Sequence, residues 1–191
     1  MEKHCSETPS TWRNFEQISS ELDLSEKDIK EKLILDLGSG GAGFAEGVKK
    51  QQELSSRVVS LDPNYNLETL TEENRDLMRD AVKEISEQKL QAVAGLSESL
   101  PFKDEVFDLI ISNHAVPWHI SGDTKKVIKS IEEIVRVLKP GGEARLHPVE
   151  ENVVRIIHGI LGKDCSIETR KGTVIIKKNL PPELKSDRIS E

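Results

Sequence analysis

Cysteine is scarce in this sequence, with only Cys5 and Cys165 among 191 residues. Two cysteines are too few for a disulfide framework, and they lack the close spacing that a zinc site uses. We therefore expect a protein of a reducing compartment that has no metal site.

The sequence also lacks a long apolar run and an excess of basic residues. No run approaches the roughly 20 residues that span a bilayer, and the first ten residues have no apolar leader segment. The 27 Lys and Arg residues are outnumbered by 34 Asp and Glu residues, which gives a net charge of -7 and disfavours nucleic acid and anionic membranes as partners. We expect a cytoplasmic protein that binds small molecules or proteins, with no nucleic acid and no membrane partner.

Apolar runs of strand length alternate with segments of helical period, which favours a single α/β domain. Several of the runs are continuously apolar, as in parallel strands that are covered on both faces. The strand candidates are Lys32–Leu37, Arg57–Leu61, Leu90–Ala94, Phe107–Ser112 and Glu143–His147. Helical stripes are predicted over Leu67–Ile85, Val127–Leu138 and Val153–Leu161, the second with Asp123 or Thr124 as N-cap and Pro140-Gly141-Gly142 as its stop.

The two ends of the chain depart from this alternation. Two β-rich runs, Cys165–Arg170 and Thr173–Lys178, are joined at Lys171-Gly172 and predict an antiparallel hairpin. Upstream, Trp12, Phe15, Ile18 and Leu22 share a helical face, and Ser25 to Asp28 resembles a capping box. We divide the chain into an N-terminal helical cap or lid with a disordered start (1–31), a main domain (32–179) and a tail (180–191), with frayed residues before Ser10 and after Leu180.

A glycine-rich loop follows the first predicted strand in LILDLGSGGAGFAE. Gly38, Gly40 and Gly43 have the G-x-G-x-x-G spacing that is typical of a dinucleotide phosphate loop. Asp36 lies two residues before the first glycine, where a buried carboxylate would repel a pyrophosphate but could pair with an ammonium or stabilise a sulfonium. The alternative is that Asp36 caps a local turn.

A second carboxylate, Asp62, ends the second predicted strand 19 residues after Gly43. An acidic side chain at this place accepts hydrogen bonds from the ribose hydroxyls of an adenosine-containing ligand. More than one family of nucleotide-binding proteins uses such a carboxylate, so it does not distinguish between them. Asp62-Pro63 could also be only a turn.

Four segments, LILDLGSGGAG, VVSLDPN, SLPFKDEVFDLIIS and EEIVRVLKPGGEARL, resemble in order and spacing the class I S-adenosylmethionine-dependent methyltransferases, particularly the small-molecule type. The resemblance covers about Lys32 to Val149, and the hairpin corresponds to the family's reversed last strand. It implies a Rossmann-like, doubly wound, mostly parallel seven-stranded sheet with an antiparallel strand and helices on both faces. It also implies S-adenosyl-L-methionine as cofactor and methyl transfer to a small-molecule acceptor by direct displacement.

The resemblance assigns the cofactor-binding residues as well. Asp36 would lie near the amino group of the cofactor, Asp62 would hold the ribose, and Asn113 would lie beside the sulfonium. The full set is Asp36, Gly38, Ser39, Gly40, Asp62, Pro63, Leu96, Ser97 and Asn113.

One position departs from the family pattern. The family commonly carries an aspartate that accepts a hydrogen bond from the adenine amino group, and in GLSESLPF that place is Leu96. Leu96 would flank the ring while the Ser97 N–H reaches a ring nitrogen. The missing hydrogen bond is worth about 1 kcal/mol. Glu98 or Ser99 could replace it after a small loop shift, or remain solvated turn residues.

The segment NHAVPWHI, residues 113–120, follows a strand end and should line the acceptor side. Alignment can supply much of the catalysis of methyl transfer, and a base helps only when the acceptor must lose a proton. His119 is the first candidate base and His114 the second, since imidazole titrates near neutral pH, and His147 is the third. Each of them could instead pack or bond a backbone carbonyl.

The acceptor pocket is expected to be small and partly open, because the segments that would cover it are short. Trp118 could stack on an aromatic acceptor or pack under its own loop, and Trp12 and Phe15 could form a lid. A second copy of the chain or a protein partner could complete the pocket. Residues 113–116 lack the prolines and aromatic residue of members that methylate nucleic-acid bases, which again disfavours nucleic acid.

Two other functions stay open. A catalytically weak or inactive methyltransferase-like subunit, acting as a binding or regulatory partner, would account for Leu96 and the weak candidate bases. A nicotinamide dehydrogenase has only the glycine spacing in its favour.

Overall fold

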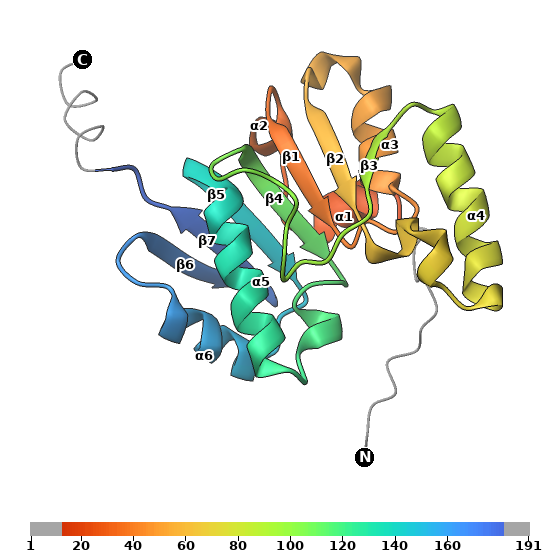
Figure 1. The fold of residues 1–191 in the computed structure, drawn as a ribbon. Coiled ribbons are helices and arrows are strands. Elements are labelled where there is room, and N and C mark those ends of the chain that lie inside the picture. The colour runs from red at the N-terminus through yellow and green to blue at the C-terminus, as the bar shows by residue number, and fades with distance from the viewer. Residues whose placement is uncertain (1–12, 182–191) are drawn as a thin grey trace.

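The computed structural model describes residues 13–181, so Trp12 and nearly all of the two predicted frayed ends lie outside the described residues. A sheet of seven strands forms the centre, in the spatial order β3-β2-β1-β4-β5-β7-β6 (Figure 1). The strands are β1 (Leu33–Leu37), β2 (Arg57–Leu61), β3 (Gln91–Val93), β4 (Phe107–Asn113), β5 (Leu138–His147), β6 (Cys165–Arg170) and β7 (Thr173–Lys178).

The first five strands pair in parallel, whereas β7 runs antiparallel to β5 and β6 antiparallel to β7. This confirms the predicted mostly parallel, doubly wound sheet that ends in a hairpin. The hairpin forms where the sequence indicates, because Lys171 and Gly172 both adopt the positive φ angles that a tight turn requires.

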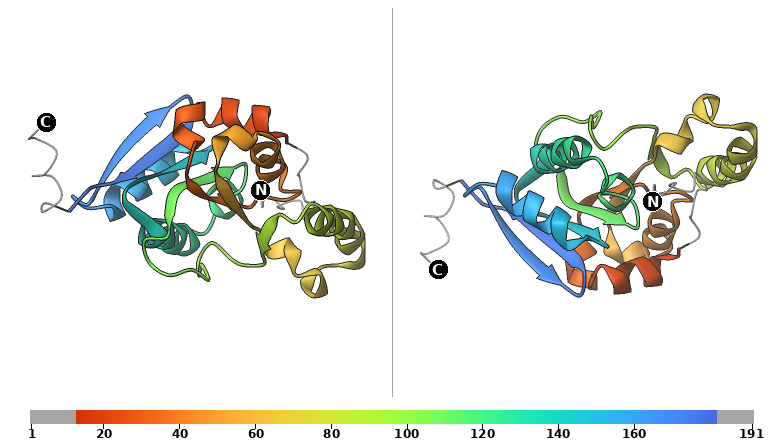
Figure 2. Two further views of the ribbon diagram at one scale, coloured as in Figure 1. Left: turned by 90° about the horizontal axis from the view of Figure 1, so that it is seen from above. Right: turned by 90° about the horizontal axis from the view of Figure 1, so that it is seen from below.

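Helices cover both faces of the sheet, as Figure 2 shows. They are α1 (Phe15–Glu21), α2 (Glu26–Ile29), α3 (Gly43–Lys50), α4 (Glu72–Glu87), α5 (Thr124–Val137) and α6 (Glu151–Ile160). Because side chains alternate along a strand, Leu35 and Leu37 of β1 pack with α5 and α6, while Ile34 packs with α1 to α3. β1 is therefore buried on both faces, as its continuous apolar run predicts.

Two predicted boundaries were wrong. The helical stripe predicted from Leu67 begins only at Glu72, because the Asn66 side chain accepts from Glu68 N in a separate turn and Thr71 then caps α4. Pro140-Gly141-Gly142 does not separate α5 from its strand but lies inside β5. There the pairing with β4 shifts from Phe107–Leu138 to Leu109–Glu143, and this irregularity accommodates the extra residues.

The N-terminal helices pack closely on the main domain. A Cβ atom on Gly47 would lie 2.1 Å from Phe15 Cβ, so only glycine lets α1 approach α3 this closely. Arg145 of β5, 6% exposed, donates to the carbonyls of Leu22 and Asp23 and pairs with Asp28 Oδ1 at 3.3 Å. These contacts fix where α1 ends against the sheet.

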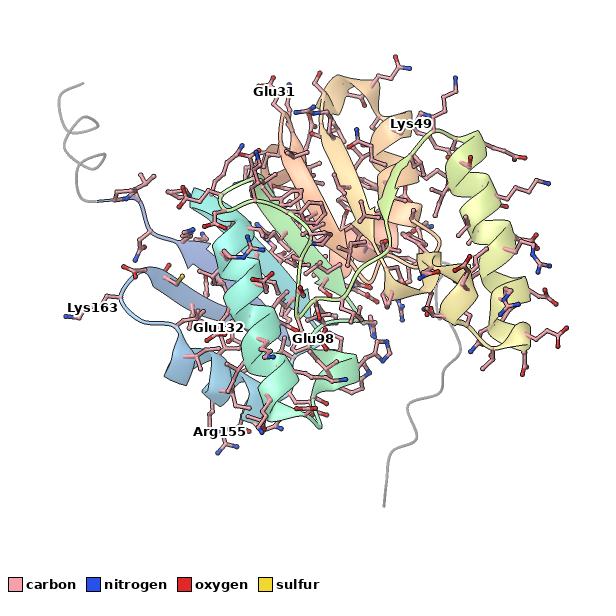
Figure 3. The ribbon with its side chains drawn as sticks, viewed as in Figure 1. Glu31, Lys49, Glu98, Glu132, Arg155 and Lys163 are labelled. Atoms are coloured by element: carbon pink, nitrogen blue, oxygen red, sulfur yellow. The ribbon has the colours of Figure 1, made fainter. Side chains whose placement is uncertain are left out.

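Charged side chains cover much of the outer surface, and Figure 3 shows Arg155 of α6 and Lys163 of the following loop projecting outward. Among residues 13–181, no helix combines the length and apolar character needed to cross a bilayer.

Candidate functional site

The candidate site lies at the carboxyl ends of β1, β2, β4 and β5. The chain runs from β1 outward to β2 and β3 and then returns to form β4 on the other side of β1. Such a reversal of strand order opens a crevice where ligands bind in doubly wound sheets. The structure thus brings Asp36, Asp62, Asn113, His114 and His147 to one edge of the sheet.

The amides of the glycine loop after β1 are hydrogen-bonded to the end of β2. Gly38 N and Ser39 N both donate to Leu61 O, at 2.7 and 3.3 Å, and Gly40 N donates to Asp62 Oδ2 at 3.0 Å. A phosphate loop would instead leave such N–H groups for the anion. These three donors are therefore not available to a pyrophosphate, in spite of the G-x-G-x-x-G spacing.

The loop is also held by Tyr65, to which the sequence analysis gave no role. The Tyr65 hydroxyl donates to Gly40 O at 2.7 Å and lies 2.8 Å from Ser39 Oγ. Burial raises the pKa of Tyr65, so the phenol keeps its proton and remains a donor. The available signal was Asp62-Pro63, which begins the 3-10 turn η2 (Pro63–Tyr65) and points Tyr65 back at the loop.

Asp36 is a buried carboxyl, 3% exposed, in the middle of the sheet. Its Oδ2 atom is buried and has no hydrogen-bond partner within residues 13–181, which argues against the alternative of a turn cap. Burial, together with the nearby charge of Asp62, raises the pKa of Asp36 to about 7. A cationic group beside Asp36 would reverse this effect, because it would stabilise the ionised carboxylate.

Asp62 is 5% exposed and caps the turn after β2, where Oδ1 accepts from Asn64 N at 2.9 Å. Burial raises the pKa of Asp62, while the two backbone N–H donors and the nearby His119 act to lower it. His119 therefore lies on the Asp62 side of the site. Since each carboxylate oxygen can accept two hydrogen bonds, the Asp62 carboxylate keeps capacity for further donors.

The segment after β3 presents an apolar surface to the site edge. Leu96 is 56% exposed, more than Leu77 or Trp118, the other exposed large hydrophobic residues among residues 13–181. Ser97, in contrast, is buried, and its hydroxyl lies 2.9 Å from Ser130 Oγ and donates to Glu98 Oε2 at 3.0 Å. The Glu98 carboxylate is thus engaged with Ser97, whereas Leu96 is the side chain that faces outward.

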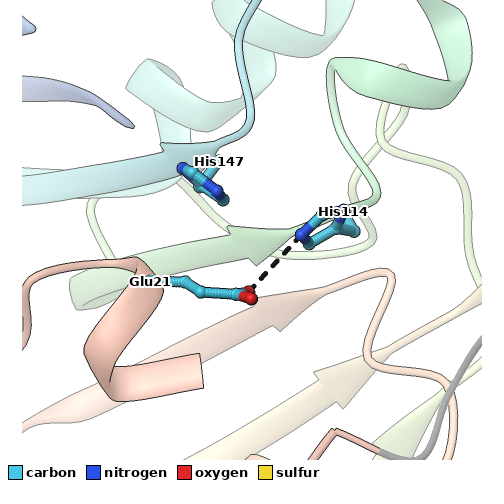
Figure 4. A group of neighbouring side chains, drawn as sticks. All are labelled: Glu21, His114 and His147. Atoms are coloured by element: carbon cyan, nitrogen blue, oxygen red, sulfur yellow. Dashed lines mark ion pairs between the residues drawn. The ribbon is translucent and has the colours of Figure 1, made fainter. Parts of the chain in front are cut away.

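A separate group of side chains lies at the ends of β4 and β5 (Figure 4). His114 Nε2 lies 3.4 Å from Glu21 Oε2, and Asn113 Nδ2 donates to the same oxygen at 2.9 Å. The His114 and His147 rings meet edge to face, with centroids 5.5 Å apart. Burial and the neighbouring Arg13 lower the pKa of His114, against the opposing effect of Glu21.

Glu21 is a residue that the sequence analysis missed. It is the last residue of α1, and nothing in its neighbourhood in the sequence distinguishes it from other surface glutamates. Only the packing of α1 against α3 and the sheet brings Glu21 to residues more than 90 positions away.

The other candidates are divided between two places. His119 and Trp118 lie on the 3-10 turn η4 (Trp118–Ile120), where both are exposed, Trp118 to 39%. Phe15, expected as part of a lid, packs on Phe44 in the core with ring centroids 5.3 Å apart. His119 acts on Asp62, whereas His114 lies against Glu21.

The residues present fit a cationic adenosine derivative. Within residues 13–181, the buried Oδ2 atom of Asp36 has no hydrogen-bond partner, the adjacent loop offers no free N–H at its first three positions, and Asp62 retains acceptor capacity. All three features suit ammonium, sulfonium and hydroxyl groups, and the first two oppose a pyrophosphate.

Comparison with known proteins gives a family for this arrangement. Residues 35–146 match the family described as "Methyltransferase domain", which is more than half of the chain. The glycine/sarcosine/dimethylglycine N-methyltransferase of Actinopolyspora halophila is 30% identical over 68% of this chain and 20% of its own length. The malonyl-[acyl-carrier protein] O-methyltransferase of Buchnera aphidicola is 35% identical over 57% of this chain and 36% of its own length.

Solved structures show the same fold. A Methanococcus maripaludis protein, described as an S-adenosyl-L-methionine-dependent methyltransferase, superposes with a TM-score of 0.59 at 20% identity, over 88% of this chain and 84% of its own. The [4+2]-cyclase SpnF superposes with a TM-score of 0.58 at 13% identity, over 87% and 80% of the two chains. The chain spans only a fifth to about a third of the two curated relatives.

Proposed function

The chain belongs to the class I S-adenosylmethionine-dependent methyltransferases, and from this premise we propose that it transfers a methyl group to a small-molecule acceptor. The cofactor of the family is S-adenosyl-L-methionine, whose sulfonium carries an activated methyl group. The acceptor attacks that carbon by direct displacement, so alignment of the two molecules supplies much of the rate.

The observation that carries the proposal is the unpartnered carboxyl of Asp36. Leaving a buried carboxyl oxygen without a donor costs free energy, and the cost is recovered if a ligand supplies a cation or N–H group there. The amino group of the cofactor has this chemistry. Asp36 lies directly before the loop of Gly38, Ser39 and Gly40, so we assign these four residues to the methionine part.

The nucleoside part is assigned to the ends of β2 and β3. Asp62 would accept from the ribose hydroxyls with its remaining lone pairs, and the Pro63 turn holds its carboxylate in place. The exposed Leu96 side chain offers a flat apolar surface for adenine, beside the backbone of Ser97. Asn113, at the end of β4, would lie next to the reacting methyl group.

Two histidines remain candidates for removing a proton from the acceptor. His119 is exposed on η4 and lies close enough to Asp62 to lower the pKa of that carboxyl. His114 is half-buried against Glu21. We assign the base role first to His119, and a His119→Gln variant that retains cofactor binding but loses turnover would support it.

Isothermal titration calorimetry of the whole chain tests the proposal. S-adenosylmethionine and its demethylated product should bind with one site per chain, and NAD should not. Asp36→Asn should weaken binding of both, because it removes the charge that pairs with their common amino group. Asp76→Asn, at an exposed position of α4, is the matched control and should bind as wild type does.

Turnover is tested with cofactor carrying a labelled methyl group and an extract of small metabolites. Mass spectrometry of the fraction below 1 kDa should find a product that carries the label. If neither S-adenosylmethionine nor its demethylated product binds at millimolar concentration, the proposal is wrong. Binding without labelled product would favour the alternative of a methyltransferase-like regulatory subunit.

A further inference from the structure

We propose that Glu21, His114 and His147 form a binding site for one divalent transition-metal ion at the carboxyl ends of β4 and β5. These three side chains come from α1, from the residue after β4 and from the end of β5 (Figure 4). Each offers one ligand atom, and the three atoms lie within 4.8 Å of one another. Metal binding at this site does not depend on the proposed methyl transfer.

The distances suit a shared ion better than a hydrogen bond. His114 Nε2 and Glu21 Oε2 are 3.4 Å apart, which is long for a charge-assisted hydrogen bond. Two ligands with bonds of about 2.1 Å to one tetrahedral ion lie about 3.4 Å apart. All three ligand atoms lie within 4.8 Å of one another, and any pair farther apart than the span of about 4.2 Å that two such bonds allow is brought into range by a small side-chain rotation.

The hydrogen bonds around His147 leave its outer nitrogen for a ligand. Thr173 Oγ1 donates to Glu21 O at 3.0 Å, so its lone pairs face His147 Nδ1, which lies 3.0 Å away. Nδ1 therefore carries the proton and donates to Thr173, while Nε2 keeps its lone pair. Fixing the tautomer through the second ring nitrogen is how proteins orient histidine ligands. The same threonine ties His147 to the residue that supplies the carboxylate.

The surroundings of the group contain an additional polar atom. Asn113 Oδ1 is buried without a hydrogen-bond partner among residues 13–181, while its Nδ2 atom donates to Glu21. A water molecule bound to an ion at this place could donate to Asn113 Oδ1. Arg13 Nε lies 3.8 Å from Glu21 Oε2, and this guanidinium is one-third exposed, so it can turn toward solvent when a cation binds.

Two imidazole nitrogens and one carboxylate oxygen select the class of ion. This donor set suits Zn²⁺, Fe²⁺, Co²⁺ or Ni²⁺ rather than Ca²⁺ or Mg²⁺, which prefer oxygen ligands. Three protein ligands leave at least one position for water or another oxygen ligand, as in catalytic rather than structural sites. If the proposed function holds, an acceptor with a hydroxyl or carboxylate oxygen is the class of substrate that this position would bind.

The test uses the full chain, stripped with a chelator and then titrated with Co²⁺ and with Zn²⁺. We expect one ion per chain, with visible cobalt bands of a nitrogen and oxygen site. His147→Ala and Glu21→Gln should each weaken Zn²⁺ binding more than about 100-fold, and Thr173→Val about 10- to 100-fold, because it frees the His147 tautomer. Far-ultraviolet circular dichroism checks the fold of each variant, and His147→Ala serves if Glu21→Gln fails to fold.

Two matched variants exclude other donors. His158→Ala removes an exposed histidine of α6, and Cys5→Ser removes a thiol next to His4 in the sequence, outside the described residues. Both should bind zinc as wild type does. No uptake of ion, unchanged affinity in His147→Ala, or a thiolate charge-transfer band that Cys5→Ser abolishes would each overturn the proposal. Calorimetry with S-adenosylmethionine on the same metal-free sample tests the proposed function separately.

Discussion

The Asp62 carboxylate accepts a hydrogen bond from the Gly40 amide at 3.0 Å and so joins the end of β2 to the loop that follows β1. From the other side, the Tyr65 hydroxyl donates to the Gly40 carbonyl at 2.7 Å. Gly40 is thus held at both of its backbone polar groups, the N–H and the C=O. Asp62 has a structural role in this loop in addition to the ribose contact proposed for it.

Asp62→Asn is expected to lower both stability and cofactor affinity. The amide replaces one carboxylate oxygen with an NH₂ group, so it cannot accept from Gly40 N and Asn64 N together. Loss of one buried hydrogen bond should cost about 1–3 kcal/mol in the free energy of unfolding. Urea denaturation measures this cost. A Tyr65→Phe variant removes the second contact to Gly40 and should lose less stability. In the double variant, the total loss should be smaller than the sum of the two single losses. Unchanged stability in both variants would contradict the two-sided attachment.

Gly38→Ala is expected to disturb the crevice. A Cβ atom at this position would lie 2.2 Å from Ala115 Cβ, and the φ of +69° is unfavourable for alanine. We expect a loss of about 1–3 kcal/mol in unfolding free energy, together with weaker cofactor binding. The double variant Gly38→Ala/Ala115→Gly removes the steric contact and should recover part of the lost stability. The remaining loss comes from the positive φ at position 38, which is unfavourable for alanine. Gly122→Ala, where nothing lies within 4 Å, should show no comparable loss.

The affinity for S-adenosylmethionine should rise with pH between about 6 and 8. Asp36, with a pKa raised to about 7, is mostly protonated at pH 6 and must lose its proton to pair with a cationic ligand. The ionised fraction of Asp36 is about ten times larger one pH unit above this pKa than one pH unit below it. Affinity should therefore be about tenfold higher at pH 8 than at pH 6. Calorimetry in two buffers of different ionisation enthalpy should detect proton release on binding at pH 6.5.

The Asp36→Asn variant is the control for this pH dependence. It should bind more weakly and with a smaller change between pH 6 and 8, and what change remains belongs to the ligand. In the free protein, the raised pKa means that the folded state binds a proton that the unfolded chain has lost between about pH 4 and 7. Stability should therefore fall as pH rises through this window, and Asp36→Asn should reduce that slope, with the part that comes from the raised pKa of Asp62 remaining.

Arg145→Met is expected to loosen the N-terminal helices. The guanidinium joins β5 to the carbonyls of Leu22 and Asp23, and its removal leaves Glu143 and Asp28 without their buried partner. The cost should reach about 3 kcal/mol. Hydrogen exchange should become faster over residues 15–29, ahead of the strands. Arg170→Met, at an exposed position paired with Glu168, should cost much less, because solvent screens an ion pair between exposed side chains.

Leu96→Asp is expected to strengthen cofactor binding. The change supplies the carboxylate that the family pattern has at this place, and a hydrogen bond of about 1 kcal/mol corresponds to about fivefold in affinity. Because the leucine side chain is 56% exposed, the substitution should leave the melting temperature within about 2 °C of wild type. Leu96→Asn tests whether the acceptor oxygen suffices without the charge. Unchanged binding in both variants would place adenine elsewhere.

The sequence by itself determined the elements and their order. The apolar runs of β1, β2 and β4 and the turn at Lys171-Gly172 are local signals, because period, burial on both faces and turn chemistry are properties of neighbouring residues. The same signals, with the glycine loop and two strand-end carboxylates, indicated the family and its cofactor. The sequence did not predict where α4 begins, because side-chain hydrogen bonds of Asn66 and Thr71 to nearby backbone groups decide it.

The tertiary structure alone decided which side chains meet. Glu21, His114, His147 and Thr173 are distributed over the length of the chain, and no spacing in the sequence relates them. They lie together because parallel strands end at one edge and because the glycines of α3 let α1 approach that edge. Likewise, whether the loop amides were free for a phosphate depended on Leu61 and Asp62 of the neighbouring strand end. Contacts between distant segments arise from packing, which a local pattern does not contain.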